Sequence, residues 1–361
     1  MTKLRDICRF QSGGTPSRGT PAYFNGNVPW ITTVALNGDV IDGNQAIEWI
    51  TDEAIAKSAA KIVPPHSVMV GTRVGIGKVA INSVPMSTSQ DIISLIGIDE
   101  NKWDKKFICH LITANKEHLT SQARGATIKG IKIEAIADLV LPEISLKEQA
   151  RISEVIGKVD ALMHMHQQMA MNLEQLIKSR FIELFGEPLS NQKGWQTMSI
   201  VEAAPIKSQR GDLADEVWLL NLDAVEAQTG TVLFKHRVQS GEINASTVYF
   251  TAESVLYSKL RPYLNKVVMP DEDGVATSEM IPMYPLADRL NRAYLCYWLR
   301  SDVFVRHISE KVAGAKMPRV SMDYFRSLAI EMPPLELQEQ FAAFVEQTDK
   351  SKLCGKMGVA A

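Results

Sequence analysis

Apolar residues recur along residues 146–185 at alternating intervals of four and three positions, which is the spacing of a coiled-coil seam. Ser145 and Glu148 form a capping-box pattern at the start of this stretch, and Gly186 and Pro188 follow it as helix-ending residues. The pattern predicts one long helix of about 60 Å, at the usual rise per residue. The seam positions are Ile152, Ile156, Val159, Met163, His166, Ala170, Leu173, Ile177, Arg180 and Leu184.

Short apolar runs with Gly, Pro and Asn between them fill the two regions that flank this helix, residues 1–143 and 188–333. Such runs predict short strands with a few helices, and therefore an α+β domain in each region. The regions also resemble each other, because Val68–Ile81 is echoed by Leu256–Met269 and the order of further matches is preserved. The aligned positions include Arg73 with Arg261, Lys78 with Lys266, and Gln149 with Gln340.

A second helical pattern follows the second region and begins near Leu335. It loses its heptad spacing in residues 347–361, where Gly355 and Gly358 interrupt it. We therefore expect a shortened helix with an irregular tail, as a truncated or recombined gene would produce. Its apolar stripe consists of Leu337, Phe341, Phe344 and Val345.

The predicted fold class is α+β, with two similar globular domains in a pseudo-two-fold arrangement, joined by long antiparallel coiled-coil helices. A long helix with an apolar seam needs an apolar partner in water, and the second helix supplies one for part of its length. The predicted boundaries are residues 1–143 and 188–333 for the domains, and residues 144–187 and 334–361 for the first and second spacer helices.

Composition adds constraints on partners and location. The 361 residues carry a formal net charge of -2, so any bound nucleic acid must be held by local basic loops or by a basic partner. The four cysteines contain no Cys-x-x-Cys pair, as expected of reduced thiols in a cytosolic protein. No signal peptide and no apolar run long enough for a bilayer is visible, which predicts a cytoplasmic protein.

Motifs for catalysis are weak. Gly71–Lys78 resembles a phosphate-binding loop, but Thr72 stands where the first glycine is needed and Val79 replaces the magnesium-binding hydroxyl residue. Glu100–Lys102 is a nuclease-like tripeptide that the second region lacks, and no Pro-Pro-aromatic motif of an amino-methyltransferase is present. We therefore expect neither a catalytic residue nor a metal or cofactor site in this chain.

Two loops carry clusters of positive charge. Ser121–Lys132 contains three basic residues and no acidic one, and residues 314–319 form a matching stretch in the second region. Glycines in both stretches permit close approach to a ligand, and Lys and Arg are the residues that contact DNA phosphates. An ordinary solvated turn remains the alternative for each of these loops.

Several motifs together resemble those of the specificity subunits of type I restriction-modification systems, and the resemblance covers nearly the whole chain. The stretches that carry it are Lys3–Ile7, Ser12–Pro16, Val28–Trp30, Gly77–Lys78, Leu141–Pro142, Glu148–Gln149 and Ile177–Pro188.

The resemblance implies two target-recognition domains that each read one half of a split sequence in double-stranded DNA, with the helices acting as ruler and as dock. The partners would be type I methyltransferase and restriction subunits, and S-adenosylmethionine, ATP and magnesium would be bound only by those subunits. The alternatives are a self-sufficient adenine-specific DNA methyltransferase and a coiled-coil scaffold protein.

Two sets of candidate site residues follow from the loops, the repeat and the resemblance. The expected DNA-binding residues are Thr15, Ser17, Arg73, Lys78, Ser89, Gln90, Arg124, Lys129, Lys132, Lys259, Arg261, Lys266, Ser278, Lys316 and Arg319. The expected partner-binding residues are Ile152, Ile156, Val159, Met163, Leu173, Ile177, Phe181, Phe341 and Phe344.

Overall fold

The computed structural model describes residues 1–38, 40–125, 129–208, 214–243, 246–314 and 316–360, with side chains as far as residue 352. The chain divides into two compact units, Met1–Leu162 and Met163–Ala361. The division falls inside the long helix α5 (Leu146–Phe185), whose predicted bounds are confirmed.

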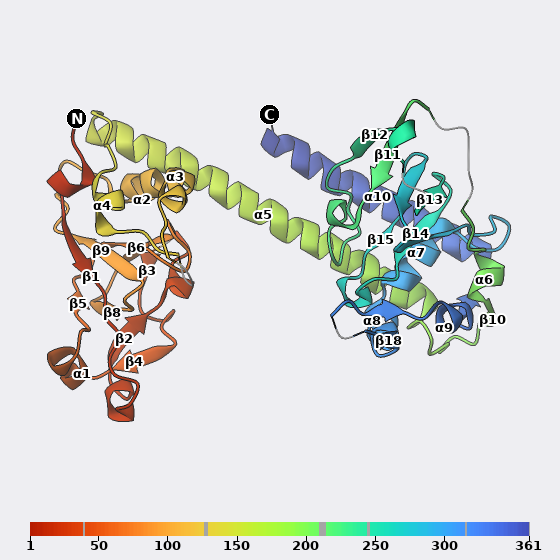
Figure 1. Cartoon of the computed structure of the whole chain (residues 1–361), viewed down its shortest axis with the longest axis horizontal. Helices are drawn as coiled ribbons and strands as arrows, with labels where there is room; N and C mark the ends of the chain where they lie inside the picture. Colours follow the sequence, from red (N-terminus) through yellow and green to blue (C-terminus); the bar gives the residue numbers. More distant parts are fainter. Residues whose placement is uncertain (39, 126–128, 209–213, 244–245, 315, 361) are drawn as a thin grey trace. The chain divides into compact units, whose positions relative to one another are not determined.

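The first unit contains two sheets (Figure 1). The five-stranded sheet has the order β1 (Arg9–Ser12), β9 (Ile92–Ile96), β6 (Val68–Gly71), β7 (Val79–Asn82) and β3 (Val40–Ile41). The four-stranded sheet has the order β4 (Glu48–Ile50), β2 (Val28–Ile31), β8 (Met86–Thr88) and β5 (Ile62–Val63). The short helices are α1 (Asp52–Lys57), α2 (Lys105–Ala114), α3 (Lys116–Ser121) and α4 (Ile133–Ala137).

The second unit repeats this plan with smaller sheets. Its four-stranded sheet has the order β12 (His236–Gln239), β11 (Glu216–Leu220), β16 (Gly274–Thr277) and β13 (Thr247–Phe250). The remaining strands pair as β15 (Val267–Val268), β14 (Val255–Ser258) and β17 (Met280–Met283), as β10 (Gln196–Ser199) with β20 (Ala329–Met332), and as β18 (Val312–Ala313) with β19 (Arg319–Val320). The helices are α6 (Ile200–Ala203), α7 (Arg292–Arg300), α8 (Asp302–Ser309), α9 (Met322–Arg326) and α10 (Leu335–Ala360).

Strand pairing confirms that the two units share one topology. In each four-stranded sheet the two central strands are parallel, and each is bordered by an antiparallel edge strand. The hairpin β6–β7 pairs with β9, and the hairpin β14–β15 pairs with β17 in the same antiparallel sense. The sequence repeat therefore reflects two similar α+β domains, as predicted.

Helix α10 runs antiparallel to the second half of α5 within the second unit (Figure 1). Near its start, the Phe341 ring packs edge-on against Phe181 at 5.4 Å between ring centroids. Eleven residues further along α10, Lys352 forms an ion pair of 2.9 Å with Glu174, which precedes Phe181 in α5. The predicted antiparallel partner is present over this part of the seam.

The irregular tail expected after residue 347 is wrong, because α10 continues as a helix to Ala360. Gly355 and Gly358 lie inside it. A glycine in a helix interior costs only about 1 kcal/mol relative to alanine, and here the two glycines stand among Lys, Met, Val and Ala. Isolated glycines therefore weaken this helix without ending it.

A buried glutamine joins the first turn of each long helix to its own domain. Gln149 accepts a hydrogen bond from the Asp104 backbone amide at 3.0 Å, and its amide group donates to the carbonyl oxygens of Lys102 and Ile144. Asp104 is the N-cap residue of α2, so the glutamine fixes α5 against the start of that helix.

The same three hydrogen bonds recur in the second unit, made by Gln338. It accepts from the backbone amide of Asn291, the N-cap residue of α7, at 2.7 Å, and donates to the carbonyl oxygens of Arg289 and Pro333. Gln338 rather than the aligned Gln340 is therefore the structural equivalent of Gln149. Each is the fourth residue of its helix, whereas Gln340 is exposed.

We predict that Gln338→Ala destabilises the second unit by at least about 2 kcal/mol, because it leaves a buried amide and two carbonyl groups without partners. Gln340→Ala is the matched control in the same helix and should change the free energy of unfolding by less than about 0.5 kcal/mol. Thermal unfolding followed by circular dichroism tests this. Equal midpoints for the two variants would contradict the role given to Gln338.

Candidate nucleic-acid interface

In the first unit, the turn between β6 and β7 presents a cation on a tight backbone. Gly75 and Gly77 have φ angles of +74° and +76°, which favour glycine. A Cβ atom on Gly77 would lie 3.2 Å from the Lys116 side chain, so the turn packs closely on the start of α3. The exposed Lys78 and Lys116 are thereby held near each other, and Lys116 is a basic residue that the sequence analysis did not single out.

The basic loop before α4 docks onto this turn. Ile131 donates a backbone hydrogen bond to Thr72 at 2.8 Å, and Arg124 and Gly130 exchange two backbone hydrogen bonds of 3.0 Å. Gly130 allows the Arg73 side chain to cross the loop, since a Cβ atom there would lie 2.7 Å from Arg73 Cγ. Residues 126–128 of this loop lie outside the described residues.

We call the resulting set of exposed cations the first basic surface. It comprises Arg73, Lys78, Lys116, Arg124, Lys129 and Lys132.

The second unit builds an equivalent surface from the turn after β14 and the strand pair β18–β19. Lys259 accepts a backbone hydrogen bond from Val320 at 3.0 Å, and Arg261 donates one to Pro318 at 2.8 Å. Arg261, which the sequence repeat aligns with Arg73, adopts a left-handed conformation with a φ of +49°. The second basic surface comprises the half-buried Lys259 and the exposed Arg261, Lys316 and Arg319.

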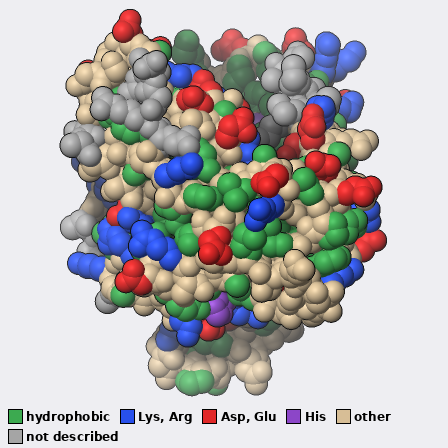
Figure 2. Space-filling view, turned by 90° about the vertical axis from the view of Figure 1, so that its right-hand side faces the viewer, with side chains coloured by type: hydrophobic (Ala, Val, Ile, Leu, Met, Phe, Trp, Pro, Cys, Tyr) green, Lys and Arg blue, Asp and Glu red, His purple; other side chains and the backbone are tan. Residues whose placement is uncertain are grey.

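Each basic surface also contains one carboxylate that holds an arginine. Asp91 Oδ1 lies 3.4 Å from Arg73 Nη1, and Glu279 binds Arg319 through two nitrogens, with Nη2–Oε1 at 2.8 Å and Nε–Oε1 at 3.0 Å. The two acids are equivalent in the repeat, because the carbonyl oxygen of each accepts a hydrogen bond from the backbone amide that starts the neighbouring turn. In the view of Figure 2, Lys and Arg are likewise interspersed with Asp and Glu.

Some predicted DNA-binding residues are not available at these surfaces. Ser89 is buried, with 6% of its surface exposed, because its backbone closes the turn between β8 and β9. Lys266 is half-buried, its ammonium group donates to the carbonyl oxygen of Leu222 at 2.6 Å, and burial lowers the pKa of this group. Thr15 is half-buried, whereas Ser17, Gln90 and Ser278 are exposed.

The predicted partner-binding residues fall into two groups. Ile177, Phe181 and Phe341 are buried in the core of the second unit, where α5, α7 and α10 cover them, so their prediction as an external surface is wrong. Leu173 and Phe344 are half-buried there, and Ile156 is half-buried in the first unit. Ile152, Val159 and Met163 are exposed, Val159 at 45% and Met163 at 47%.

Helix α5 exposes more apolar side chains than the predicted seam contains. These side chains lie at irregular intervals along the helix and on more than one side of it, so the heptad spacing did not predict them. The additional exposed residues are Val155, Leu162, Met165, Met169, Met171, Leu176 and Ile182.

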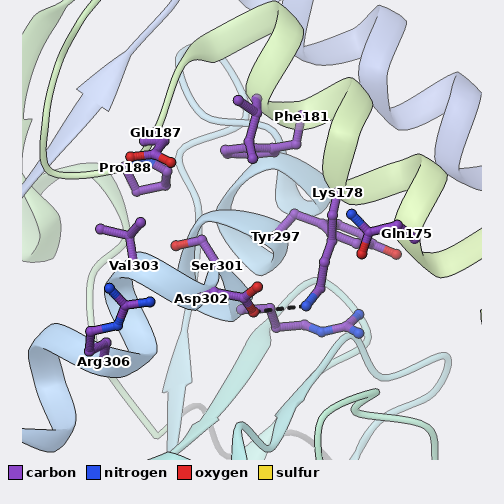
Figure 3. Close-up of a pocket in the computed structure, with 12 residues that line it drawn as sticks. Gln175, Lys178, Phe181, Glu187, Pro188, Tyr297, Ser301, Asp302, Val303 and Arg306 are labelled. Carbon is purple, nitrogen blue, oxygen red and sulfur yellow. Dashed lines mark hydrogen bonds and ion pairs between the residues drawn. The ribbon is translucent and has the colours of Figure 1, made fainter.

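A pocket of about 310 Å³ lies in the second unit between the end of α5 and the junction of α7 and α8 (Figure 3). Lys178 and Asp302 form an ion pair of 2.8 Å at its edge, and Phe181, Pro188 and Val303 supply apolar walls. Ile182 lines the pocket and is also exposed on α5. One of the exposed apolar residues of α5 therefore forms part of the wall of this pocket.

Over the described ranges of the chain, no cluster of three or more His, Cys, Asp or Glu side chains could hold a metal ion. Within the same ranges, no helix is long and apolar enough to cross a membrane.

Comparison with known proteins assigns the chain to a family. Residues 1–175 and 192–354 match the type I restriction modification DNA specificity domain. The type I restriction enzyme MjaIX specificity subunit of Methanocaldococcus jannaschii is 23% identical over 378 residues, covering 96% of this chain and 85% of that protein. The EcoR124I/EcoR124II specificity subunit of Escherichia coli is 30% identical over 166 residues, covering 44% and 40%.

Solved structures agree at the level of the fold. The S subunit of a type I restriction-modification system from M. genitalium superposes with a TM-score of 0.56 at 14% identity, covering 99% of this chain and 91% of that chain. The chain belongs to the family of type I restriction-modification DNA specificity domains. It is a specificity subunit without catalytic activity of its own, and catalysis resides in partner subunits.

We predict that Gly77→Ala destabilises the first unit by about 1–2 kcal/mol, because alanine is strained at this φ angle and its Cβ atom meets Lys116. Gly157→Ala is the control, for which the expected change in the free energy of unfolding has the opposite sign. It lies inside α5 with no atom within 4 Å of a new Cβ, and should stabilise the helix by about 0.5–1 kcal/mol. Thermal melts of both variants decide the matter, and a shift in the same direction for both would contradict it.

Proposed function

We propose that each unit reads one half of a bipartite DNA sequence through its own basic surface. The observation that carries this proposal is the recurrence of one assembly, in which a turn after a buried strand binds a basic loop through an equivalent backbone hydrogen bond, from Ile131 to Thr72 and from Val320 to Lys259. Exposed cations supply the contacts to phosphates that fix register on the duplex. The domain boundaries at residues 1–143 and 188–333 are part of this proposal.

Sequence is read at base edges rather than at phosphates. In this proposal the exposed polar residues beside the basic surfaces, Ser17 and Gln90 in the first unit and Ser278 in the second, contact bases together with arginines. A glutamine pairs well with adenine, and an arginine with guanine. Ser89 and Lys266 are left out because of their burial and their internal hydrogen bond.

Helix α5 has two roles in the proposal. Its fixed length sets the gap between the two halves of the target, because a helix is stiff over its length. Its exposed apolar residues, of which Met163 is one, form the dock for a methyltransferase subunit, since a helix with an uncovered apolar face requires a partner. S-adenosylmethionine, ATP and magnesium belong to the methyltransferase and restriction subunits, and DNA as substrate places the complex in the cytoplasm.

The proposal predicts the outcome of coexpression with the cognate methyltransferase subunit, followed by mapping of methylated adenines in the host DNA. We expect one split motif, with two specified halves separated by a constant number of unspecified base pairs. Methylation depends on both subunits, so expression of either alone is the control. A continuous motif, or methylation by this chain alone, would overturn the proposed function.

A second prediction concerns docking. Met163→Glu places a charge on the exposed apolar side of α5 and should abolish copurification with the methyltransferase subunit. Gln45→Glu adds the same charge at an exposed position between β3 and β4, outside α5, and should leave copurification intact. Affinity purification with a tagged methyltransferase subunit measures both. Equal recovery of the two variants would exclude this face as the dock.

A further inference from the structure

A carboxylate stands at the same place in each basic surface, where it opposes the binding of DNA. Asp91 follows β8 and Glu279 follows β16, and these two strands occupy equivalent positions in their sheets. The side chains of both acids are only partly exposed, at 28% and 21%. A negative charge at this position repels phosphates. Because it is present in both units despite this cost to DNA binding, we looked to its contacts for a function.

The contacts of Glu279 show what the carboxylate holds. Arg319 uses Nε and Nη2 to bind it, and this edge of a guanidinium group can also bind the O6 and N7 atoms of guanine. Arg319 cannot offer the same edge to a base and to Glu279 at once. In the first unit, Asp91 holds Arg73 by a single longer contact of 3.4 Å, and the hold is correspondingly weaker.

The other cations are not restrained in this way. Among the described residues, Arg124, Lys129 and Lys316 form no ion pair. They can contact the phosphates of any DNA duplex, whether or not it carries the target sequence. The restraint therefore falls on one arginine in each unit and not on the basic surface as a whole.

We infer that Asp91 and Glu279 are specificity-determining residues, which withhold Arg73 and Arg319 from non-target DNA and release them only to a matching site. The inference rests on the proposed function. On non-target DNA the arginine would exchange its carboxylate for a phosphate, which at best replaces the ion pair that is lost. At the target, a base edge accepts both nitrogens and replaces both hydrogen bonds.

The test uses the complete complex with its methyltransferase subunit and two duplexes. One duplex carries the mapped target, and the other is a scrambled duplex of equal length and composition. We expect Glu279→Gln to bind the scrambled duplex about two- to fivefold more tightly, the range for breaking one exposed ion pair. The slope of log affinity against log salt should steepen by about 0.9, as for one more phosphate contact. Affinity for the target should change less, so the ratio between the two duplexes falls.

Three further variants make the result specific. Asp91→Asn should act in the same direction with a smaller effect, and it tests the inference independently if Glu279→Gln does not fold. The gain should disappear when Glu279→Gln is combined with Arg319→Ala, because no arginine is then released. Glu53→Gln, in the exposed ion pair with Lys57 on α1, changes the net charge equally and should leave both affinities unchanged.

The outcomes separate the inference from the proposed function. Equal tightening on both duplexes, no change on either, or a loss confined to the target duplex would each overturn the inference. The last of these would show that the carboxylate itself contacts a base, as acidic residues do with cytosine. A wild-type complex that does not distinguish the two duplexes would instead overturn the proposed function.

Discussion

The requirement that a buried amide group find hydrogen-bond partners determines where each long helix begins. Gln149 and Gln338 are almost fully buried, at 1% and 0% exposed, so water cannot replace a lost partner. Each side-chain amide is satisfied by one amide and two carbonyl groups of its own domain. Because one of these groups belongs to the N-cap residue of α2 or α7, the glutamine fixes the start of the long helix to the start of a domain helix. The direction in which α5 or α10 leaves its domain follows from this junction.

The two halves of α5 then have different environments. In the second unit, α7 and α10 bury Ile177 and Phe181, and Glu174 binds both Arg300 and Lys352. Earlier residues of the helix, such as Met163, lack such cover. An apolar helix face is stable in water only when it is covered, so the same heptad spacing serves the fold at one end and a partner at the other.

The bounds of α5, the duplicated topology and the exposed basic loops could be predicted from the sequence. They could be predicted because each depends on the spacing and order of residues along the chain. The predictions that were wrong depend on contacts with residues distant in the sequence, which no local pattern reveals. Lys266 aligns with Lys78, but in the second unit the carbonyl oxygen of Leu222 lies within its reach. Gln340 aligns with Gln149, but helix phase places Gln338 in the buried position. Phe181 is one of the predicted partner-binding residues, yet Phe341 of the same chain packs against it.

The overall charge of -2 means that the protein as a whole does not attract DNA, so binding depends on local groups of cations. A uniformly basic face would gain affinity for every duplex, and most of the DNA that a specificity subunit meets is not its target. A basic surface of only a few cations in each unit limits the non-specific contribution. Placing Glu279 against Arg319 limits it further at the residue best suited to read a base. Selectivity between sequences is a difference between two affinities, so weakening the wrong complex is as effective as strengthening the right one.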